Sequence, residues 1–306
     1  LHQLTEDQLA TIDVPDMRID TLNELYSPEK TTYAKITYFL PGTVPRSEKA
    51  PDTEVNSIRT CDAIILVVRN FQSKGFSAPE PNKEIEEAET EMILTDLLVV
   101  EKRLARLEKD LNRGRSVNME ELALLKQCRD MLESNRPLRS DDGLAGSGLL
   151  KGFTFLSAKP LLVIFNNADN DSEIPEHAAV PAGAAADILQ ARLEHEIAMM
   201  DSEDTALFLD EYGIREAAAD KIIRTSYELM GLISFFTVGS DEVRAWRVTA
   251  GTPAPEAGDV IHSDIRKGFI RAEIVSYPHL LEAGSYSGAR KEGTVRLEGR
   301  DYCVND

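Results

Sequence analysis

Two amides and a carboxylate follow directly on a short apolar run in the second half of the chain. The run is Pro160–Phe165, written PLLVIF, and Asn166, Asn167 and Asp169 come next. Asn and Asp side chains commonly end strands and cap helices by hydrogen-bonding to nearby backbone, so this cluster is typical of a simple turn. The same groups can also read the edge of a purine base, because a carboxylate accepts hydrogen bonds from ring N–H groups. The residues alone leave both interpretations open.

The composition limits the class of protein. The 306 residues carry a net charge of −19, which disfavours non-specific binding to nucleic acid, since phosphates attract clustered Lys and Arg. No apolar run reaches the about 20 residues that a membrane span needs, and no signal-peptide pattern is visible. Cys61, Cys128 and Cys303 lie far apart, without disulfide or zinc spacing. We therefore expect a cytoplasmic protein with no membrane partner.

The apolar run belongs to a series of segments that predict an α/β fold. Strands apolar on both faces and separated by long connections favour a parallel sheet covered by helices. The strands expected in this sheet are Lys35–Leu40, Ala63–Val68 and Pro160–Phe165. Helical patterns follow at Asp187–Met200 and Ala217–Leu232. Alternating strand patterns then indicate a small mixed C-terminal domain, with strands at Val243–Val248, Ile270–Val275 and Thr294–Glu298.

A long helical segment interrupts the α/β pattern. Glu84–Leu111 contains no Gly or Pro, and its apolar residues recur at alternating steps of four and three, as in a heptad seam. These residues are Ile93, Leu97, Val100, Leu104, Leu107 and Leu111. A turn at Arg113–Arg115 and a second helix at Met119–Glu133 complete an antiparallel hairpin. Ser140–Gly148, rich in Gly and Ser, predicts a flexible connector back to the sheet.

The hairpin is locally basic near its tip. Residues 101–115 hold six basic side chains against three acidic ones. A positive tip on an acidic protein can contact RNA or an acidic partner, and it can equally be a solvated face with i,i+4 ion pairs. The candidate partner-binding residues are Lys102, Arg103, Arg106, Arg113 and Arg115.

Segments along the chain resemble the YchF branch of the Obg-like P-loop NTPases, of the TRAFAC class. Val243–Trp246, Val260–Glu273 and Glu298–Tyr302 are similar to the family's C-terminal TGS domain. Upstream segments follow in the family's order, and these are Val14–Asp20, Asp62–Arg69, Glu101–Glu108 and Ser226–Phe236.

The resemblance implies a P-loop NTPase-like, mostly parallel sheet with an inserted antiparallel helical hairpin and a C-terminal β-grasp (ubiquitin-like) TGS domain. We expect a nucleotide-binding domain at residues 1–82 and 140–235, the hairpin at 83–139 and the TGS domain at 236–306. The resemblance further implies a purine nucleotide, ATP or GTP with Mg²⁺, and association with the ribosome or RNA through the helical arm and the TGS domain.

The residues that would hold phosphates depart from the family's pattern. No GxxxxGK[ST] motif occurs in the sequence, and the family's phosphate loop would precede Val14. The chain begins without Met and ends at Val304–Asp306 in a strand-like pattern, so we expect both ends to be incomplete. In the family's Asp-x-x-Gly motif, Gly42 matches the glycine that senses phosphate, but Phe39 stands in place of the aspartate. The resemblance therefore leaves the catalytic residues and hydrolysis itself unassigned.

The residues that would read the base are better preserved. The family's Asn-x-x-Glu is matched by Asn166 to Asp169, where Asn166 would brace the pocket and Asp169 would supply a carboxylate compatible with guanine. Asn167 stands where many GTPases have the lysine that covers the base. A second loop, Leu189–Glu194, would offer the Ala191 N–H to a purine oxygen and pack Arg192 on the base.

Three functions therefore compete, of which we favour the first. The first is a nucleotide-binding NTPase-family protein that regulates translation or associates with the ribosome. The second is a pseudo-NTPase scaffold that has lost hydrolysis, and the third is a TGS-mediated module that binds RNA or protein.

Overall fold

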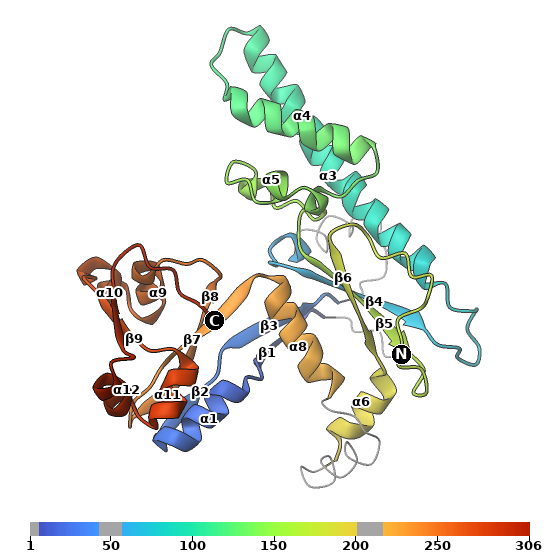
Figure 1. Ribbon diagram of the computed structural model, residues 1–306. Helices are drawn as coiled ribbons and strands as arrows, with labels where there is room; N and C mark the ends of the chain where they lie inside the picture. The colour runs from blue at the N-terminus through green and yellow to red at the C-terminus, as the bar shows by residue number, and fades with distance from the viewer. Residues whose placement is uncertain (1–5, 43–56, 201–216) are drawn as a thin grey trace. The chain divides into compact units, whose positions relative to one another are not determined.

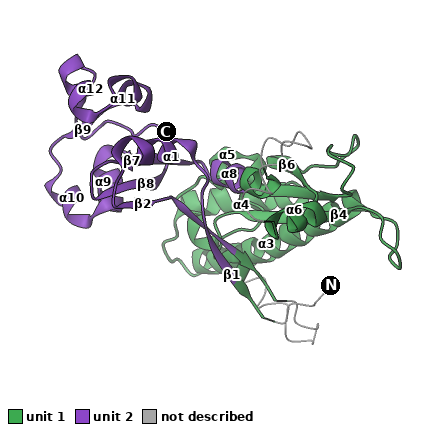
Figure 2. Ribbon diagram, turned by 90° about the horizontal axis from the view of Figure 1, so that it is seen from below, with its two compact units in different colours: residues 1–8, 39–222 green, residues 9–38, 223–306 purple. Residues whose placement is uncertain are grey.

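The computed structural model describes residues 6–42, 57–200 and 217–306, which form two compact units. The first unit contains the residues up to Gln8 together with residues 39–222, and the second contains residues 9–38 and 223–306 (Figure 2). Residues 9–38 thus pack with the C-terminal part of the chain. The domain boundaries expected at 82, 139 and 235 stay a prediction.

A three-stranded parallel sheet lies at the centre of the first unit (Figure 1). Its strands are β4 (Ile64–Asn70), β5 (Leu161–Asn167) and β6 (Ala184–Leu189), in the order β4-β5-β6. Residues Leu161–Phe165 of the central strand are all at most 2% exposed. A run buried on both faces is what a central parallel strand requires, so the predicted parallel sheet is confirmed for the strands expected at Ala63–Val68 and Pro160–Phe165. The placement of Lys35–Leu40 in this sheet is wrong, because that strand pairs with Gln8–Asp13 in a separate two-stranded sheet.

Helix α3 (Pro81–Asn112) begins beside the sheet and continues into a hairpin with α4 (Met119–Glu133) (Figure 1). Its first half packs Ile85 and Met92 against the sheet in a core shared with Val163 and Phe165. Its second half packs on α4 through Ile93, Val100, Leu104, Leu107, Leu122, Leu125, Cys128 and Leu132. Asn118 begins α4 by accepting from the N–H groups of the next turn. The predicted helical hairpin is confirmed.

The prediction of a flexible connector at Ser140–Gly148 is wrong. This stretch forms part of a compact segment with two 3₁₀ helices, η1 (Leu138–Ser140) and η2 (Lys151–Phe153), and the short helix α5 (Asp142–Ala145). Asp141 caps α5 by accepting from the Leu144 N–H at 3.1 Å. Leu144 and Leu150 are each 4% exposed and extend the hairpin core. Burial of these leucines stabilises the segment despite its Gly and Ser content.

A layer of buried charges joins α3 to the segment that leads into β5. The Asp96 carboxylate is fully buried and accepts from the N–H and the hydroxyl of Ser157, at 2.7 and 2.8 Å. Arg59 lies 3.2 Å from the same carboxylate. Arg139 pairs with Glu89 at 2.6 Å, and both are largely buried. Each of these buried charges has a partner, as it must, because isolated buried charge is strongly unfavourable.

The last part of the first unit departs from the predicted helix at Asp187–Met200. Asp187, Ile188 and Leu189 belong to β6, whose register pairs Ile188 with Phe165, and helix α6 covers only Ala191–Ala198. Pairing with β5 overrides the local helical pattern. Helix α8 (Ala218–Leu229) follows, and its first N–H groups donate to the Glu194 carboxylate of α6 at 2.9 and 3.3 Å.

The second unit is built on the sheet β2-β8-β7, with β2 (Lys30–Thr32) parallel and β7 (Leu232–Thr237) antiparallel to the central β8 (Glu242–Thr249). Helix α1 (Met17–Tyr26) packs Ile19 and Leu22 in a core with Val243 and Leu280. β1 (Gln8–Asp13) pairs with β3 (Lys35–Leu40). The remaining elements are α9 (Ala254–Ile261), α10 (Ser263–Gly268), β9 (Ala272–Ile274), α11 (Tyr277–Ala283), α12 (Tyr286–Glu292) and β10 (Arg296–Glu298).

Trp246, the single tryptophan of the chain, lies on β8 opposite Phe235 of β7. Its indole Nε1 donates to the Thr237 hydroxyl at 2.9 Å. The Arg244 guanidinium carbon lies 3.9 Å from the ring centroid, within the range of a cation–π contact. The ring is therefore fixed by a hydrogen bond at its edge and a cation on its face.

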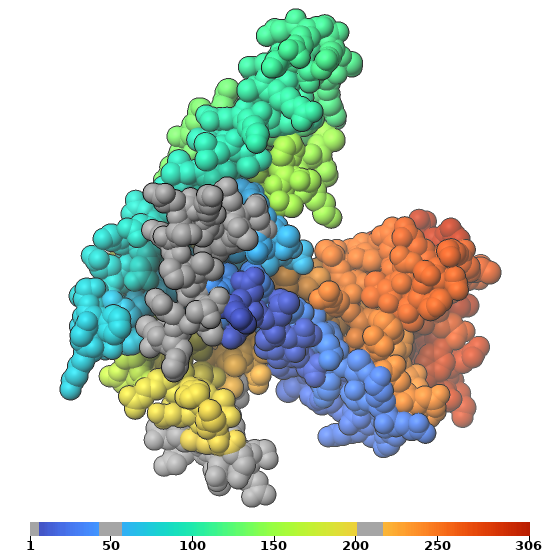
Figure 3. Space-filling view, turned by 180° about the vertical axis from the view of Figure 1, so that it is seen from behind, coloured from blue at the N-terminus to red at the C-terminus, as the bar shows by residue number. Residues whose placement is uncertain are grey.

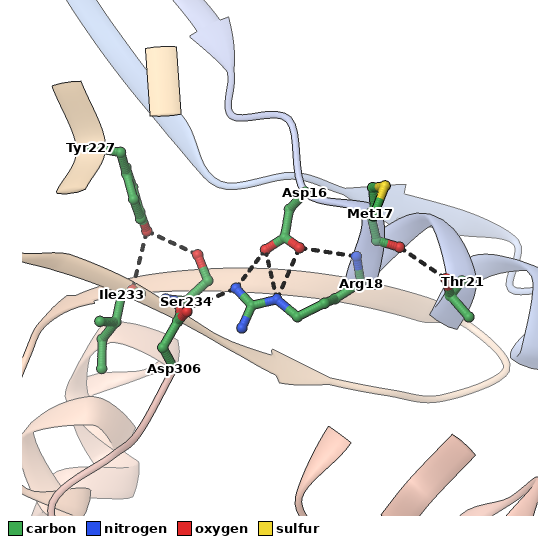
Figure 4. Close-up of polar contacts among 8 residues, drawn as sticks. All are labelled: Asp16, Met17, Arg18, Thr21, Tyr227, Ile233, Ser234 and Asp306. Atoms are coloured by element: carbon green, nitrogen blue, oxygen red, sulfur yellow. Dashed lines mark hydrogen bonds and ion pairs between the residues drawn. The ribbon is translucent and has the colours of Figure 1, made fainter. Parts of the chain in front are cut away.

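The strand expected at Val304–Asp306 does not form. Instead, the Asp306 side chain accepts from the Ser234 N–H at 2.9 Å and from Arg18 at 3.0 Å (Figure 4). Asp16 holds the same guanidinium and also caps α1. These contacts join the two ends of the second unit's sequence to β7.

Candidate functional site

The polar cluster of Asn166, Asn167 and Asp169 lies at the carboxyl ends of the parallel strands. The register pairs Arg69 with Asn166, Asn70 with Asn167, and Asn166 with Leu189. All three strands therefore end at one edge of the sheet, and the loops after β5 and β6 leave from neighbouring positions. Crevices at this edge are where α/β proteins bind ligands.

Asn167 is turned into the protein. It is 3% exposed, its Oδ1 accepts from Asn70 Nδ2 at 2.9 Å, and its Nδ2 donates to the Glu173 carbonyl at 2.8 Å. Both ends of the amide are thus engaged within the protein. In this arrangement Asn167 holds the loop after β5 in place, and its contact with a base stays a prediction.

Asn166 joins the two loops. Its Oδ1 accepts from the Ala191 N–H at 3.2 Å, across from the end of β5 to the start of α6. The expected role of Asn166 in bracing a base pocket stays a prediction. The Ala191 N–H is engaged by Asn166 here, so its expected contact with a purine oxygen would need that hydrogen bond to be shared or exchanged.

Asp169 and Arg192 face each other from these two loops. Arg192 Nε lies 3.4 Å from Asp169 Oδ2, and it also lies 3.3 Å from Glu196 Oε1. The side chains of Asp169 and Arg192 are 39% and 77% exposed. A carboxylate and a planar guanidinium therefore stand accessible beside each other at the edge of the sheet.

Gln190, which the sequence analysis did not single out, ties the two loops together. Its Nε2 lies within hydrogen-bond distance of three backbone carbonyls, those of Ala168, Asp169 and Asp171, at 3.3, 2.9 and 3.1 Å. It stands one residue before α6, so its side chain reaches back over the loop after β5. No motif in the sequence announces this role, because a glutamine before a helix has no distinctive pattern.

The phosphate-side candidate Gly42 is engaged by another part of the chain. Its N–H donates to Asp7 Oδ1 at 3.0 Å. A Cβ at this position would lie 2.7 Å from the Glu6 backbone, so only glycine fits the close approach. The Asp7 carboxylate therefore accepts the hydrogen bond that the family resemblance predicts the Gly42 N–H to donate to a phosphate.

The described residues 6–42, 57–200 and 217–306 contain no group of three or more His, Cys, Asp or Glu side chains that could hold a metal ion. Mg²⁺ at phosphoryl sites prefers one or two carboxylates together with phosphate oxygens.

The basic residues of the arm differ in their surroundings. Arg103 makes a two-point contact with Glu121 of α4, at 2.7 and 2.9 Å, and so helps hold the hairpin together. Arg115 pairs with Asp110 at 2.9 Å. Lys102, Arg106 and Arg113 are exposed, and no described residue forms an ion pair with them. Their role in binding a partner stays a prediction.

Within the part of the chain that the structure describes, no helix has the length and apolar character needed to cross a bilayer.

Comparison with known proteins extends these observations to the whole chain. The family model YchF-GTPase_C, described as a protein of unknown function (DUF933), matches residues 232–306. The ribosome-binding ATPase YchF of Bacillus subtilis (strain 168) is 35% identical over 98% of this chain and 87% of its own length. The protein of the same name from Escherichia coli O157:H7 is 32% identical with the same coverage.

The fold also matches a solved structure. The YchF GTPase of Schizosaccharomyces pombe aligns with a TM-score of 0.86 and 26% sequence identity, over 97% of this chain and 85% of that one. This match confirms the expected fold class, a P-loop NTPase-like α/β domain with a helical insertion and a C-terminal domain. With relatives above 30% identity that it covers along most of their length, the chain belongs to the YchF family.

Proposed function

We propose that this chain binds a purine nucleotide at the carboxyl ends of β4, β5 and β6 and acts in association with the ribosome. The observation that carries the proposal is the meeting of Asn166, Asp169, Ala191 and Arg192 across two loops at this edge. The relatives named ribosome-binding ATPase YchF support both parts, the nucleotide and the partner.

The chemistry of the two exposed side chains suits a purine. A carboxylate such as Asp169 can accept from both N1–H and N2–H₂ of guanine, whereas adenine offers an acceptor at N1 and would leave one oxygen unmatched. The Arg192 guanidinium can stack on the base plane. GTP and ATP are both within the proposal, and Asp169 favours guanine.

Asn166 and Gln190 would keep the two loops in register with each other. Asn166 links β5 to the first residue of α6, and Gln190 Nε2 lies within hydrogen-bond distance of the carbonyls of Ala168, Asp169 and Asp171. A ligand that inserts between the loops would then meet a preformed edge, which lowers the cost of ordering on binding.

A second candidate is favoured by the contact between Asp7 and Gly42. The Gly42 N–H is satisfied by a carboxylate of this chain, and Phe39 replaces the family's aspartate. A protein arranged in this way would bind nucleotide as a scaffold without hydrolysing it.

Ribosome association is proposed through the tip of the helical arm and the C-terminal domain, from the names of the relatives and the local positive charge at the tip. A cytoplasmic location belongs to the same proposal. The expected domain division, with the nucleotide at 1–82 and 140–235, the arm at 83–139 and the TGS domain at 236–306, belongs to the same proposal.

Binding of GDP, ADP, GTP and ATP by isothermal titration calorimetry tests the proposal, with and without Mg²⁺. We expect saturable binding that Asp169→Asn weakens about tenfold or more for guanine nucleotides and changes little for adenine nucleotides, since one charge-assisted acceptor is lost. Asp130→Asn, on an exposed site of α4, is the matched control. Absence of saturable binding of all four nucleotides would sink the proposal. Measuring phosphate release during incubation with GTP or ATP distinguishes a hydrolysing enzyme from a scaffold that only binds the nucleotide.

A further inference from the structure

One face of helix α3 changes character along its length in three steps. We call it the outer face of α3, because it points away from the sheet and from α4. At 3.6 residues per turn its members fall within an arc of about 120°. They are acidic first, then apolar, then basic: Glu84, Glu87, Glu91, Leu94, Leu98, Lys102, Arg106, Lys109 and Arg113.

Apart from Glu84, whose carboxylate accepts from the Arg69 N–H at 3.4 Å, this face has little contact with the rest of the protein. Leu94 and Leu98 are 54% and 67% exposed, which is unusual for leucines in a helix that also packs on a core. Among the residues that the structure describes, no ion pair involves Glu87, Glu91 or Lys102. Figure 3 shows cyan and teal residues of the α3 region at the molecular surface, up to the tip of the hairpin.

The opposite side of the same helix is already occupied. Its first half buries Ile85 and Met92 against the sheet, and its second half buries Val100 and Leu104 against α4. Arg103, which lies on that side, is held by Glu121. The charges of the outer face are therefore not needed to hold the hairpin together.

The outer face is complementary to itself when two copies run antiparallel. One register places the charges within the helix opposite charges of the other sign: Glu91 faces Lys102, Glu87 faces Arg106, and Glu84 faces Lys109. The same register brings Leu94 and Leu98 of the two copies together at the centre. Each contact occurs twice, as a two-fold axis requires.

We propose that the outer face of α3 is the interface of a homodimer with an antiparallel pair of α3 helices. RNA suits this face less well, because phosphates would be repelled by the acidic third and would gain nothing from the leucines. A second copy of the chain matches the acidic, apolar and basic parts of this face at the same time. The inference goes beyond nucleotide binding and does not depend on it.

The dimer is expected to be reversible and sensitive to salt. A helix of 32 residues is about 48 Å long, and a single helix pair buries less surface than large obligate interfaces do. Its ion pairs are exposed at the rim and are screened by salt. Sedimentation equilibrium of the full chain over a wide range of protein concentration, at low and at high salt, measures this association.

Charge reversal tests the register. The variant Lys102→Glu with Arg106→Glu and the variant Glu87→Lys with Glu91→Lys should each dimerise at least about tenfold more weakly than the wild type, since like charges then face each other. An equimolar mixture of the two variants should dimerise again, because each reversed end meets its complement. Combining all four changes in one chain should restore the homodimer in the same way.

The matched control is Lys126→Glu, an exposed position on α4 outside this face, which should leave the association unchanged. Circular dichroism of each variant verifies that the hairpin is folded. A wild type that stays monomeric at low salt, reversals without effect, or a mixture that stays monomeric would each overturn the proposal. Wild-type protein that is monomeric but binds RNA through Lys102 and Arg106 would show that the face serves nucleic acid instead.

Discussion

The Asp96 carboxylate accepts two hydrogen bonds from the single residue Ser157, one from its N–H at 2.7 Å and one from its hydroxyl at 2.8 Å. Asp96 lies on α3 and Ser157 lies just before β5, so this contact fixes the arm to the sheet at its base. The Leu156 N–H and Arg59 complete the surroundings of the carboxylate. The long helix is thus held where it passes from the sheet to the hairpin.

Asp96→Asn should destabilise the first unit by about 2–4 kcal/mol, because the amide places an N–H₂ group against buried donors. Urea denaturation followed by circular dichroism measures the change in the free energy of unfolding. Asp130→Asn, an exposed carboxylate on α4, should change the stability by less than about 0.5 kcal/mol. Equal stability of Asp96→Asn and the wild type would show that the buried contact contributes nothing.

The buried carboxyl of Glu89 should make the free energy of unfolding depend on pH. Burial raises the pKa of its carboxyl above the ordinary value, and Arg139 only partly offsets this. The folded state therefore binds the proton more tightly than the unfolded state does. The stabilising contribution of Glu89 is full below its unfolded pKa and is lost as the pH rises through the folded pKa.

The difference in unfolding free energy between the wild type and Glu89→Gln should accordingly shrink as the pH rises from about 4 towards neutrality. Parallel urea titrations of both proteins at several pH values measure it. A difference that grows with pH would mean that the pairing with Arg139 outweighs burial. Glu133→Gln, on an exposed position of α4, serves as the control.

Two leucines of α3 should respond differently to truncation. Leu104 is 4% exposed in the hairpin core, and Leu98 is 67% exposed on the outer face. Leu104→Ala should cost about 2–5 kcal/mol of stability because it leaves a cavity, while Leu98→Ala should cost little in dilute protein. Thermal unfolding at low protein concentration compares the two. A large loss for Leu98→Ala alone would contradict the assignment of its face to solvent.

Gln190→Ala should weaken nucleotide binding without unfolding the protein. The change frees the carbonyls of Ala168, Asp169 and Asp171 and lets the loop after β5 move away from α6. We expect about tenfold weaker binding, the equivalent of roughly one lost hydrogen bond, with an unchanged melting temperature. Gln127→Ala, exposed on α4, is the control. Isothermal titration calorimetry with the preferred nucleotide measures the change in affinity. An unaltered affinity would show that Gln190 does not contribute to the nucleotide site.

Much of the architecture could be predicted because burial leaves a clear pattern in the residues. The strand at Lys35–Leu40 and the helix at Met119–Glu133 have the predicted bounds, since alternation and heptad spacing mark them directly. The segment around Leu144 could not be predicted in this way. Its Gly and Ser suggest mobility, and only the hairpin core that receives its leucines decides its conformation.

The candidate site could be predicted in part. The pairing of strand ends brings Asn166 to Ala191 and Asp169 to Arg192, four residues that the family resemblance assigned to one site. The strand before Ala191 was not predicted, because its sequence has a helical pattern. The burial of Asn167 depends on Asn70, which lies 97 residues away in sequence. The role of Gln190 depends on the path of a loop before it in the chain. Such contacts arise from tertiary structure and have no local pattern.

The position of Trp246 on β8 has a practical consequence. As the chain's single tryptophan lies in the second unit, its fluorescence is an intrinsic optical label for that unit alone. When the indole is excited selectively, its fluorescence emission should change as the β7–β8 pair unfolds. It should not change while only the parallel sheet unfolds. A calorimetric transition with no matching change in emission would therefore belong to the first unit, and the two units can be distinguished without adding any probe.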